Sequence, residues 1–133
     1  MAEENVEVVR RTLEAFNRRD WDEWESRHHA DFEWSDPPGF PGGGMHRGVA
    51  EVRRFIDGVL ETADEWQVQI DEVEDTPDHR VLLSGRTVLV GRASGLAMDE
   101  PMFQLFEISD GRISRVETFR SRETAIRAAG LPE

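Results

Sequence analysis

The sequence predicts an α+β fold, with helical segments first, a sheet after them and a short helix at the end. Before residue 63, apolar residues recur every three or four positions, which is typical of helices that bury one face. Between residues 66 and 120, apolar and polar residues alternate, which is typical of strands. Because the strands follow one another after the helices, we expect the helices to cover a largely antiparallel sheet.

Three helices are expected in the first half of the chain. The first is marked by apolar residues that share one helical face: Val6, Val9, Leu13 and Phe16. The second begins after the N-cap residue Asp20 and ends at His28 and His29, where a positive charge suits the helix dipole. The third covers residues 49–62, which carry a broad apolar stripe.

The strands are expected around turn residues. One short strand is predicted at 31–35, and residues 36–44 are predicted to be irregular because prolines and glycines exclude a helix there. Four more strands are predicted at the alternating segments 66–70, 80–92, 96–108 and 112–120. Asp110-Gly111 marks a hairpin turn. A last helix follows Ser121 and ends at Gly130.

Composition restricts the possible functions. The 133 residues suit one domain, residues 1–133, and show no repeat or linker. All 16 basic residues are Arg, against 28 acidic ones, and a net charge of −12 disfavours nucleic acid and anionic membranes as partners. With no cysteine, no apolar run long enough to cross a bilayer and no signal-like N-terminus, a cytoplasmic location is expected.

Several motifs occur in a characteristic order: Asn5–Arg11 with Glu14–Asn17, Asp20-Trp21-Asp22, His46-Arg47-Gly48, Phe106–Ile113, and Arg122–Ala125 with Ala128–Leu131. Together they resemble the nuclear-transport-factor-2-like superfamily, in its ketosteroid-isomerase-like and SnoaL-like polyketide cyclase branch. The resemblance implies a cone-shaped α+β barrel, in which a strongly bent antiparallel sheet wraps about three N-terminal helices around an apolar pocket. It also implies a homodimer formed through the outer face of the sheet.

Asp36 is the first candidate for a chemical role. It ends a predicted strand and precedes two prolines, which favour a stiff, extended backbone. Burial near Trp34 and Phe40, both expected to contact a ligand, would raise the pKa of Asp36 toward that of a useful general base. The stretch Ser-Asp-Pro-Pro-Gly is also similar to the one that holds the base of ketosteroid isomerases. The alternative is an Asx turn before a loop.

The resemblance to ketosteroid isomerases is incomplete. The tyrosine and the neutral carboxylic acid that polarise the substrate carbonyl correspond to Thr12 and Phe103, and the chain contains no Tyr. Phe103 is instead expected to contact a ligand. Because losing one oxyanion donor costs a few kcal/mol, we do not expect steroid isomerisation by that mechanism.

Arginine is the expected partner of Asp36. Alternation places three residues on one face of their strand: Ser84, Arg86 and Val88. The resemblance turns this face toward the pocket, where a buried Arg86 must be paired, with Asp36 as its natural partner. This pair is similar to part of the site of limonene-epoxide-type hydrolases, with Asp99 as a second carboxylate only in another strand register. The alternative is a bulge at Gly85 that turns Arg86 outward.

The last strand and the loop before the third helix add further candidates. By alternation and the resemblance, Val116, Thr118 and Arg120 face inward. His46 is a candidate acid or base, because imidazole titrates near neutral pH, and its alternative is a surface residue. No set of His, Asp or Glu has metal-ligand spacing, so neither a metal nor a cofactor is expected.

Two functions fit these observations. One is cofactor-independent acid/base catalysis of the cyclase, isomerase, dehydratase or epoxide-hydrolase type on a small apolar carbonyl compound or epoxide. There Asp36 would move a proton, Arg86 would stabilise an oxyanion and His46 would assist. The other is a non-catalytic, dimeric module that binds a hydrophobic metabolite, with Asp36 and Arg86 as a structural ion pair. Both require the two residues to face a shared cavity of about 300 Å³ or more.

Overall fold

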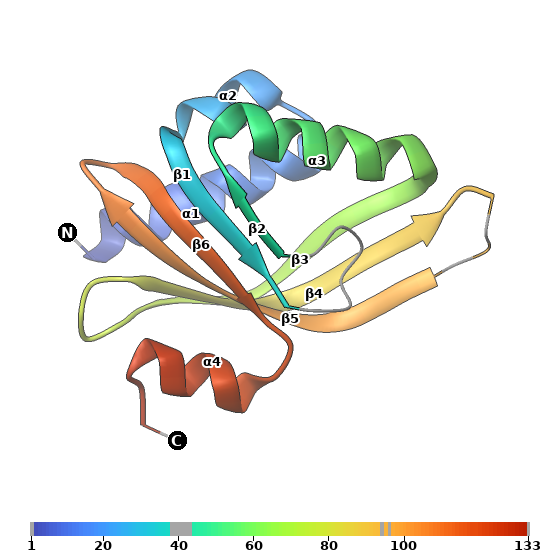
Figure 1. The fold of residues 1–133 in the computed structure, drawn as a ribbon. Coiled ribbons are helices and arrows are strands. Elements are labelled where there is room, and N and C mark those ends of the chain that lie inside the picture. The colour runs from blue at the N-terminus through green and yellow to red at the C-terminus, as the bar shows by residue number, and fades with distance from the viewer. Residues whose placement is uncertain (1, 38–43, 94, 96, 133) are drawn as a thin grey trace.

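The computed structural model describes residues 2–37, 44–93, 95 and 97–132 (Figure 1). The helices in these ranges are α1 (Ala2–Arg18), α2 (Trp21–Ser26), α3 (Val49–Thr62) and α4 (Arg122–Ala129). The strands are β1 (His28–Asp36), β2 (Gly44–Arg47), β3 (Ala63–Asp75), β4 (Val81–Gly91), β5 (Ala97–Ser109) and β6 (Arg112–Phe119). The predicted order of helices and strands is confirmed, with β2 added to it.

The strands of the described ranges form one sheet in the order β2-β1-β6-β5-β4-β3. Neighbouring strands are antiparallel, except that β1 and β6 are parallel. A parallel pair needs a long connection, and here the chain between β1 and β6 contains α3 and several further strands. The predicted α+β class is therefore confirmed, while the sheet is mixed rather than wholly antiparallel and is open rather than closed.

The helices divide between the two faces of the sheet. Helices α1, α2 and α3 cover one face, and α4 lies on the other (Figure 1). The main core fills the space between the sheet and the first three helices, and its fully buried members include Val9, Val52, Ile56 and Ile113. A smaller core lies under α4 and contains Leu82, Leu105, Ala125 and Ala129. The chain's own C-terminal helix thus covers part of the outer sheet face.

Predicted helix ends are confirmed where a local hydrogen bond defines them. The Asp20 carboxylate caps α2 by accepting a hydrogen bond from the backbone N–H of Glu23. The Ser121 hydroxyl caps α4 by accepting one from the backbone N–H of Thr124. Gly130 ends α4 with a φ of 72°, a left-handed conformation that glycine adopts without strain.

Two short segments differ from the prediction. Helix α2 ends at Ser26, and the two histidines expected in it begin β1 instead. Residues Gly44–Arg47, predicted in part as irregular loop, form β2, which pairs with β1 so that His46 lies opposite Trp34. Segments this short show no periodicity, so pairing with a neighbouring strand decides their structure.

The edge strand β3 is tied to the end of α1. Asn17 Nδ2 donates to the Val68 carbonyl at 2.8 Å, and Asn17 Oδ1 accepts from the Val68 N–H at 3.0 Å. Arg19 Nη2 donates to the Trp66 carbonyl at 2.6 Å. These bonds occupy backbone groups that an edge strand would otherwise offer to another chain. They also fix the backbone at Trp66, which lines the cavity described below.

Candidate functional site

A small cavity lies between the sheet and helices α1 and α2, with lining residues from β1 and from β3 to β6. Its volume is about 40 Å³. A buried water needs roughly 10–15 Å³ measured in this way, so the cavity has room for about three waters or a ligand of a few non-hydrogen atoms. The cavity is far smaller than the volume of about 300 Å³ or more that the sequence analysis expected, and a steroid-sized ligand does not fit this conformation.

Aromatic side chains dominate the lining: Phe16, Trp24, Trp34, Trp66 and Phe106. Phe16 packs edge to face against Trp66, with 5.0 Å between the ring centroids and 87° between the planes. Both follow from the sequence pattern, since Phe16 lies on the apolar face of α1 and Trp66 lies on the inward face of β3. The rings give the cavity rigid walls with electron-rich faces.

The polar side chains of the lining use their hydrogens within the protein. Thr12 Oγ1 donates to a backbone carbonyl one helical turn earlier, at 2.7 Å. Thr87 Oγ1 donates to Met102 Sδ at 2.8 Å. Gln104 Nε2 donates to Thr118 Oγ1 at 3.2 Å. The threonine oxygens keep lone pairs, so these side chains are left mainly as hydrogen-bond acceptors.

His28 also lines the cavity, although the sequence analysis did not select it. Only 4% of the residue is exposed, and its ring packs between Trp24 and Phe32, 4.3 Å from each ring centroid. Its Nδ1 lies 2.7 Å from the Trp24 carbonyl oxygen. A carbonyl only accepts, so Nδ1 carries the proton of the neutral ring and Nε2 is an acceptor. Burial lowers the pKa of His28 to about 4, so the ring is neutral at pH 7.

Alternation alone does not identify His28. It precedes Phe32 and Trp34 by even numbers of residues, but Ala30 between them is exposed and β1 shifts register against β6 between His28 and Glu33. The sequence pattern predicts it at the end of a helix instead.

Asp36 ends β1 as a buried residue, 7% exposed, on the same sheet face as Trp34. Burial raises the pKa of Asp36 and is the largest effect, while the side chains of Trp34 and Thr118 and the nearby His46 act in the opposite direction. Asp36 Oδ2 and Trp34 Nε1 are both buried without a well-formed hydrogen bond in the described part of the chain. Asp36 is therefore buried, as expected, and burial shifts its pKa in the direction expected, while its role as a base stays a prediction.

Asp36 adjoins the cavity through its neighbours rather than lining it. Trp34 lines the cavity, and Thr118 is hydrogen-bonded to Gln104, which also lines it. A second hollow, of about 20 Å³, is bordered by Pro37 and Thr118 and shares the lining residues Thr87 and Met102 with the cavity. The carboxyl group thus contacts residues of both hollows, Trp34 and Thr118, and lines neither of them.

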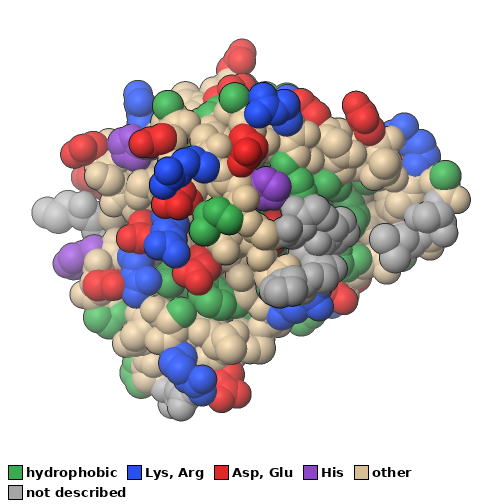
Figure 2. All heavy atoms as spheres, in the orientation of Figure 1, with side chains coloured by type: hydrophobic (Ala, Val, Ile, Leu, Met, Phe, Trp, Pro, Cys, Tyr) green, Lys and Arg blue, Asp and Glu red, His purple; other side chains and the backbone are tan. Residues whose placement is uncertain are grey.

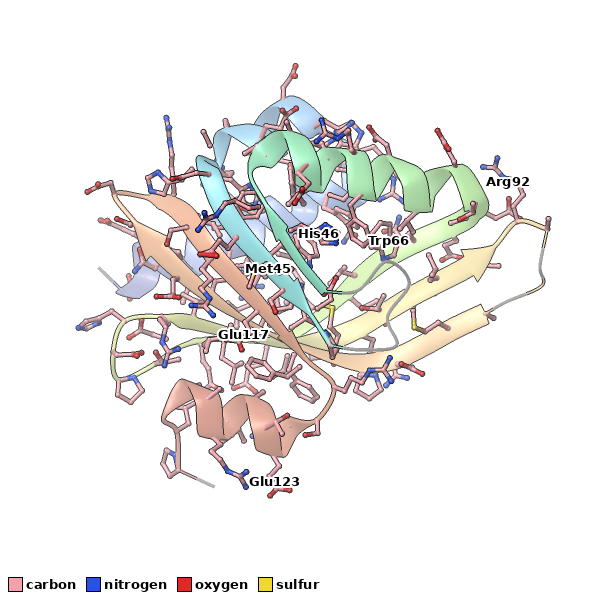
Figure 3. The ribbon with its side chains drawn as sticks, viewed as in Figure 1. Met45, His46, Trp66, Arg92, Glu117 and Glu123 are labelled. Carbon is pink, nitrogen blue, oxygen red and sulfur yellow. The ribbon has the colours of Figure 1, made fainter. Side chains whose placement is uncertain are left out.

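His46 lies on β2, next to this region. Its ring stacks on Phe55, with 4.6 Å between centroids and 22° between planes. Its Nδ1 lies 3.8 Å from Glu51 Oε2, and its proximity opposes the upward shift of the Asp36 pKa. Figure 3 shows His46 and Trp66 on the helix-covered side of the sheet. The structure therefore brings His46 and Asp36 together, while the proton-transfer role of His46 stays a prediction.

Arg86 points away from the cavity. Its Nε donates to Asp99 Oδ1 at 2.8 Å, and 39% of its side chain is exposed. The odd-numbered residues Thr87 and Leu89 face the cavity and the main core, so Arg86 lies on the opposite face of β4. The predicted pair of Asp36 and Arg86 is wrong, because the resemblance assigned the wrong face of a correctly recognised strand.

The other residues predicted on this face share the error. Ser84 pairs with Phe103 across β4 and β5, and Phe103 packs in the smaller core under α4. Val88 lies on the same outer face of β4, opposite Asp99. The prediction that Ser84, Val88 and Phe103 line the pocket is therefore wrong.

The outward direction of Arg86 does not need a bulge in its own strand. The pairing of β3 with β4 shifts register between Ile70 and Glu72, on the strand opposite Gly85. A Cβ atom on Gly85 would collide with the Gln69 carbonyl oxygen. Glycine therefore lets β3 approach closely, and ordinary alternation then carries Arg86 to the outer face.

The remaining candidates are Val116, Thr118, Arg120 and Phe40. Val116 lines the cavity, and Thr118 lies on the inner face, as predicted. Arg120 is exposed and borders the second hollow. Phe40 lies outside the described residues. Glu117 alternates with Thr118 and lies toward the α4 side of the sheet (Figure 3).

Two absences apply to the described ranges. No cluster of three or more His, Asp or Glu side chains there has an arrangement that would hold a metal ion. None of the helices there combines the length and the apolar content that a bilayer crossing requires.

The fold and the site define a cone-shaped α+β domain of the nuclear-transport-factor-2-like class. A family model described as SnoaL-like domain matches residues 9–116, and the chain belongs to this family. No curated protein sequence matches the chain.

Solved structures share the fold over nearly the whole chain. An NTF2-like protein of unknown function from Burkholderia pseudomallei has 25% identity and a TM-score of 0.78, over 95% of this chain and 97% of that one. A putative polyketide cyclase from Xanthomonas campestris has 21% identity and a TM-score of 0.77, over 95% and 96%. A Catenulispora acidiphila protein with a ketosteroid isomerase-like fold, in complex with trimethylamine, has 16% identity and a TM-score of 0.73, over 95% and 94%.

Proposed function

We propose that this protein binds a small molecule in the cavity between α1, α2 and the sheet, and that Asp36 exchanges a proton with it. The observation that carries the proposal is a buried carboxyl group beside an aromatic cavity, with no arginine partner in the described part of the chain. A carboxyl group whose pKa is raised by burial is closer to the operating pH and is a more effective general base.

The proposed chemistry is cofactor-independent proton transfer on a small carbonyl compound. Asp36 takes a proton from the carbon next to the carbonyl, and the electron pair of the broken C–H bond forms the enolate. In isomerase chemistry, the protonated Asp36 returns the proton to another carbon of a conjugated enolate. In cyclase chemistry, the enolate carbon attacks a second carbonyl carbon of the same molecule, the C=O π electrons move to that oxygen, and the oxygen takes the proton from Asp36. Epoxide hydrolysis has less support, because Arg86 and Asp99 pair with each other on the outer face.

The test begins with the ligand. Native mass spectrometry of the purified protein should reveal a bound small molecule, which is then offered to wild type, Asp36→Asn and Asp99→Asn. The two variants remove one negative charge each, so Asp99→Asn is the matched control. We expect Asp36→Asn to lower turnover at least about 100-fold, the usual scale of a general base, and Asp99→Asn to leave it unchanged. Equal turnover by Asp36→Asn would remove Asp36 as the base.

A second candidate function is binding without catalysis. It is favoured by the position of Arg86, the residue expected to stabilise an oxyanion, which lies on the outer face and pairs with Asp99. On this proposal the recovered molecule leaves wild-type protein chemically unchanged, even after long incubation. Any conversion that depends on Asp36 would contradict it.

We also propose a homodimer in the cytoplasm, without nucleic acid or membrane as partner. The resemblance and the net charge of −12 support these expectations. Met45, 56% exposed, is the exposed large hydrophobic residue of the described ranges, and acidic and basic side chains intermingle on the face drawn in Figure 2. Light scattering after size exclusion should give twice 15.2 kDa, and a mass of one chain would reject the dimer.

A further inference from the structure

We propose that the ligand of the cavity is a small organic cation, a protonated amine of about four non-hydrogen atoms. This inference rests on the proposed binding of a small molecule in the cavity, names the class of that ligand and replaces the carbonyl compound as its occupant. It differs from the neutral carbonyl compound considered above in the sign of charge and in the hydrogen bonds it requires.

The hydrogen bonds of the lining favour a ligand that donates. The hydroxyl hydrogens of Thr12 and Thr87 and the Nδ1–H of His28 are already donated to protein atoms. These three side chains therefore offer oxygen lone pairs and the unprotonated Nε2, all of them acceptors. The remaining donors are one amide hydrogen of Gln104 and the indole N–H groups of Trp34 and Trp66, which are both buried without a well-formed hydrogen bond; that of Trp34 acts on Asp36. An ammonium group, which carries donors alone, matches this set better than a carbonyl oxygen does.

The aromatic walls favour a cation for a second, independent reason. A cation within about 6 Å of a ring centroid is attracted by the negative face of the ring, most strongly for Trp and in the absence of water. This chain already uses the interaction at its surface, where the Arg53 guanidinium lies 4.2 Å from the Trp21 ring. The cavity is lined by three further indoles, from Trp24, Trp34 and Trp66.

The charge of Asp36 is the third reason. Its carboxyl group is buried, and the arginine expected beside it pairs with Asp99 on the outer face instead. A buried carboxylate is costly unless a positive charge compensates for it. His28 is neutral, no charged side chain of the described residues lines the cavity, and His46, which acts on Asp36 from β2, lies outside the lining. A cationic ligand would therefore supply the compensation, and the net charge of −12 draws cations toward the protein.

Three probes of four non-hydrogen atoms separate the ligand classes: isopropylammonium, 2-propanol and acetone. The first is a charged donor, the second a neutral donor and the third a neutral acceptor of the same shape. Each is titrated at pH 7 into wild type, Asp36→Asn and Asp99→Asn, with binding followed by ligand-observed NMR and folding checked by circular dichroism. We expect isopropylammonium to bind wild type at least tenfold more tightly than either neutral probe. Asp36→Asn should reduce the affinity for isopropylammonium at least tenfold and keep the affinities for the two neutral probes within twofold of wild type. Asp99→Asn should leave all three affinities unchanged.

The outcomes distinguish this inference from the function on which it rests. Acetone or 2-propanol binding as tightly as isopropylammonium would overturn the cationic ligand and leave a small-molecule pocket in place. The same holds if Asp36→Asn, correctly folded, binds the ammonium probe as wild type does. If none of the probes binds and the native protein carries no small molecule, the proposed pocket function itself is refuted.

Discussion

The buried imidazole of His28 makes stability depend on pH in a calculable way. The pKa of the folded ring is about 4, against an ordinary value of 6.5. As the pH falls from 7 to 5, the unfolded ring takes up a proton while the folded ring stays neutral, so the free energy of unfolding decreases. Integrating the proton uptake between these pH values gives a loss of about 2 kcal/mol from this one group.

The assay compares wild type with His28→Phe. Phe keeps an aromatic ring between Trp24 and Phe32, and it has no proton to gain. The variant loses the hydrogen bond to the Trp24 carbonyl, which changes its stability at every pH. The quantity compared is therefore the change in the free energy of unfolding between two pH values. We expect the loss of stability between pH 7 and pH 5, from urea unfolding, to be about 2 kcal/mol smaller in the variant than in wild type.

His79→Asn is the control variant. His79 is exposed and has a φ of 64°, which Asn tolerates, so His79→Asn leaves the contribution of His28 in place. The pKa of Asp36 is shifted in the opposite direction and adds stability as the pH falls, but it is common to both proteins and cancels in the comparison. If wild type and His28→Phe lose the same stability over this pH range, the ring is not held neutral by burial and the assigned tautomer has no support.

Four further substitutions test other parts of the structure by urea unfolding at pH 7. Asp36→Asn should raise the free energy of unfolding, because burial disfavours the carboxylate; a decrease would mean that the charge is well compensated. Arg86→Ala should change it by less than about 1 kcal/mol, as for other exposed ion pairs, and should leave ligand binding intact. Gly85→Ala should cost about 2–3 kcal/mol through collision with the Gln69 carbonyl, and a neutral effect would show that β3 can move away. Asn17→Ala should cost about 2 kcal/mol, since it leaves the edge of β3 unpaired, unless water replaces both bonds.

Periodicity predicted those parts of the fold in which a long segment buries one face. The apolar stripe of α3 and the alternation of β4 each extend over ten or more residues, so the pattern is unambiguous. The caps Asp20 and Ser121 were predictable because one side chain satisfies the N–H groups of one helix end. In these cases the sequence neighbours supply the interactions that decide the structure.

The site depended on information that alternation alone does not contain. The pattern of β4 separates Arg86 from Thr87 correctly, but it does not say which of the two faces the helices. Leu82 and Leu83 are both buried, one under α4 and one in the main core, so apolar content marked both faces as inward. The inward face of a strand is usually recognised because it is apolar and the other face is polar. Here the C-terminal helix covers the outer face of the sheet, so β4 carries apolar residues on both faces.

The two buried titratable groups of the site respond to the same interior in opposite ways. Burial lowers the pKa of His28 and raises the pKa of Asp36, so in each case it favours the neutral form. A cationic ligand would change this balance for Asp36 alone, because it favours the carboxylate, while the neutral His28 remains an acceptor for its N–H. Binding would then stabilise a charge that the empty protein destabilises. Asp36→Asn should therefore be more stable than wild type without ligand and gain less stability from isopropylammonium, and a larger gain in the variant would contradict the coupling.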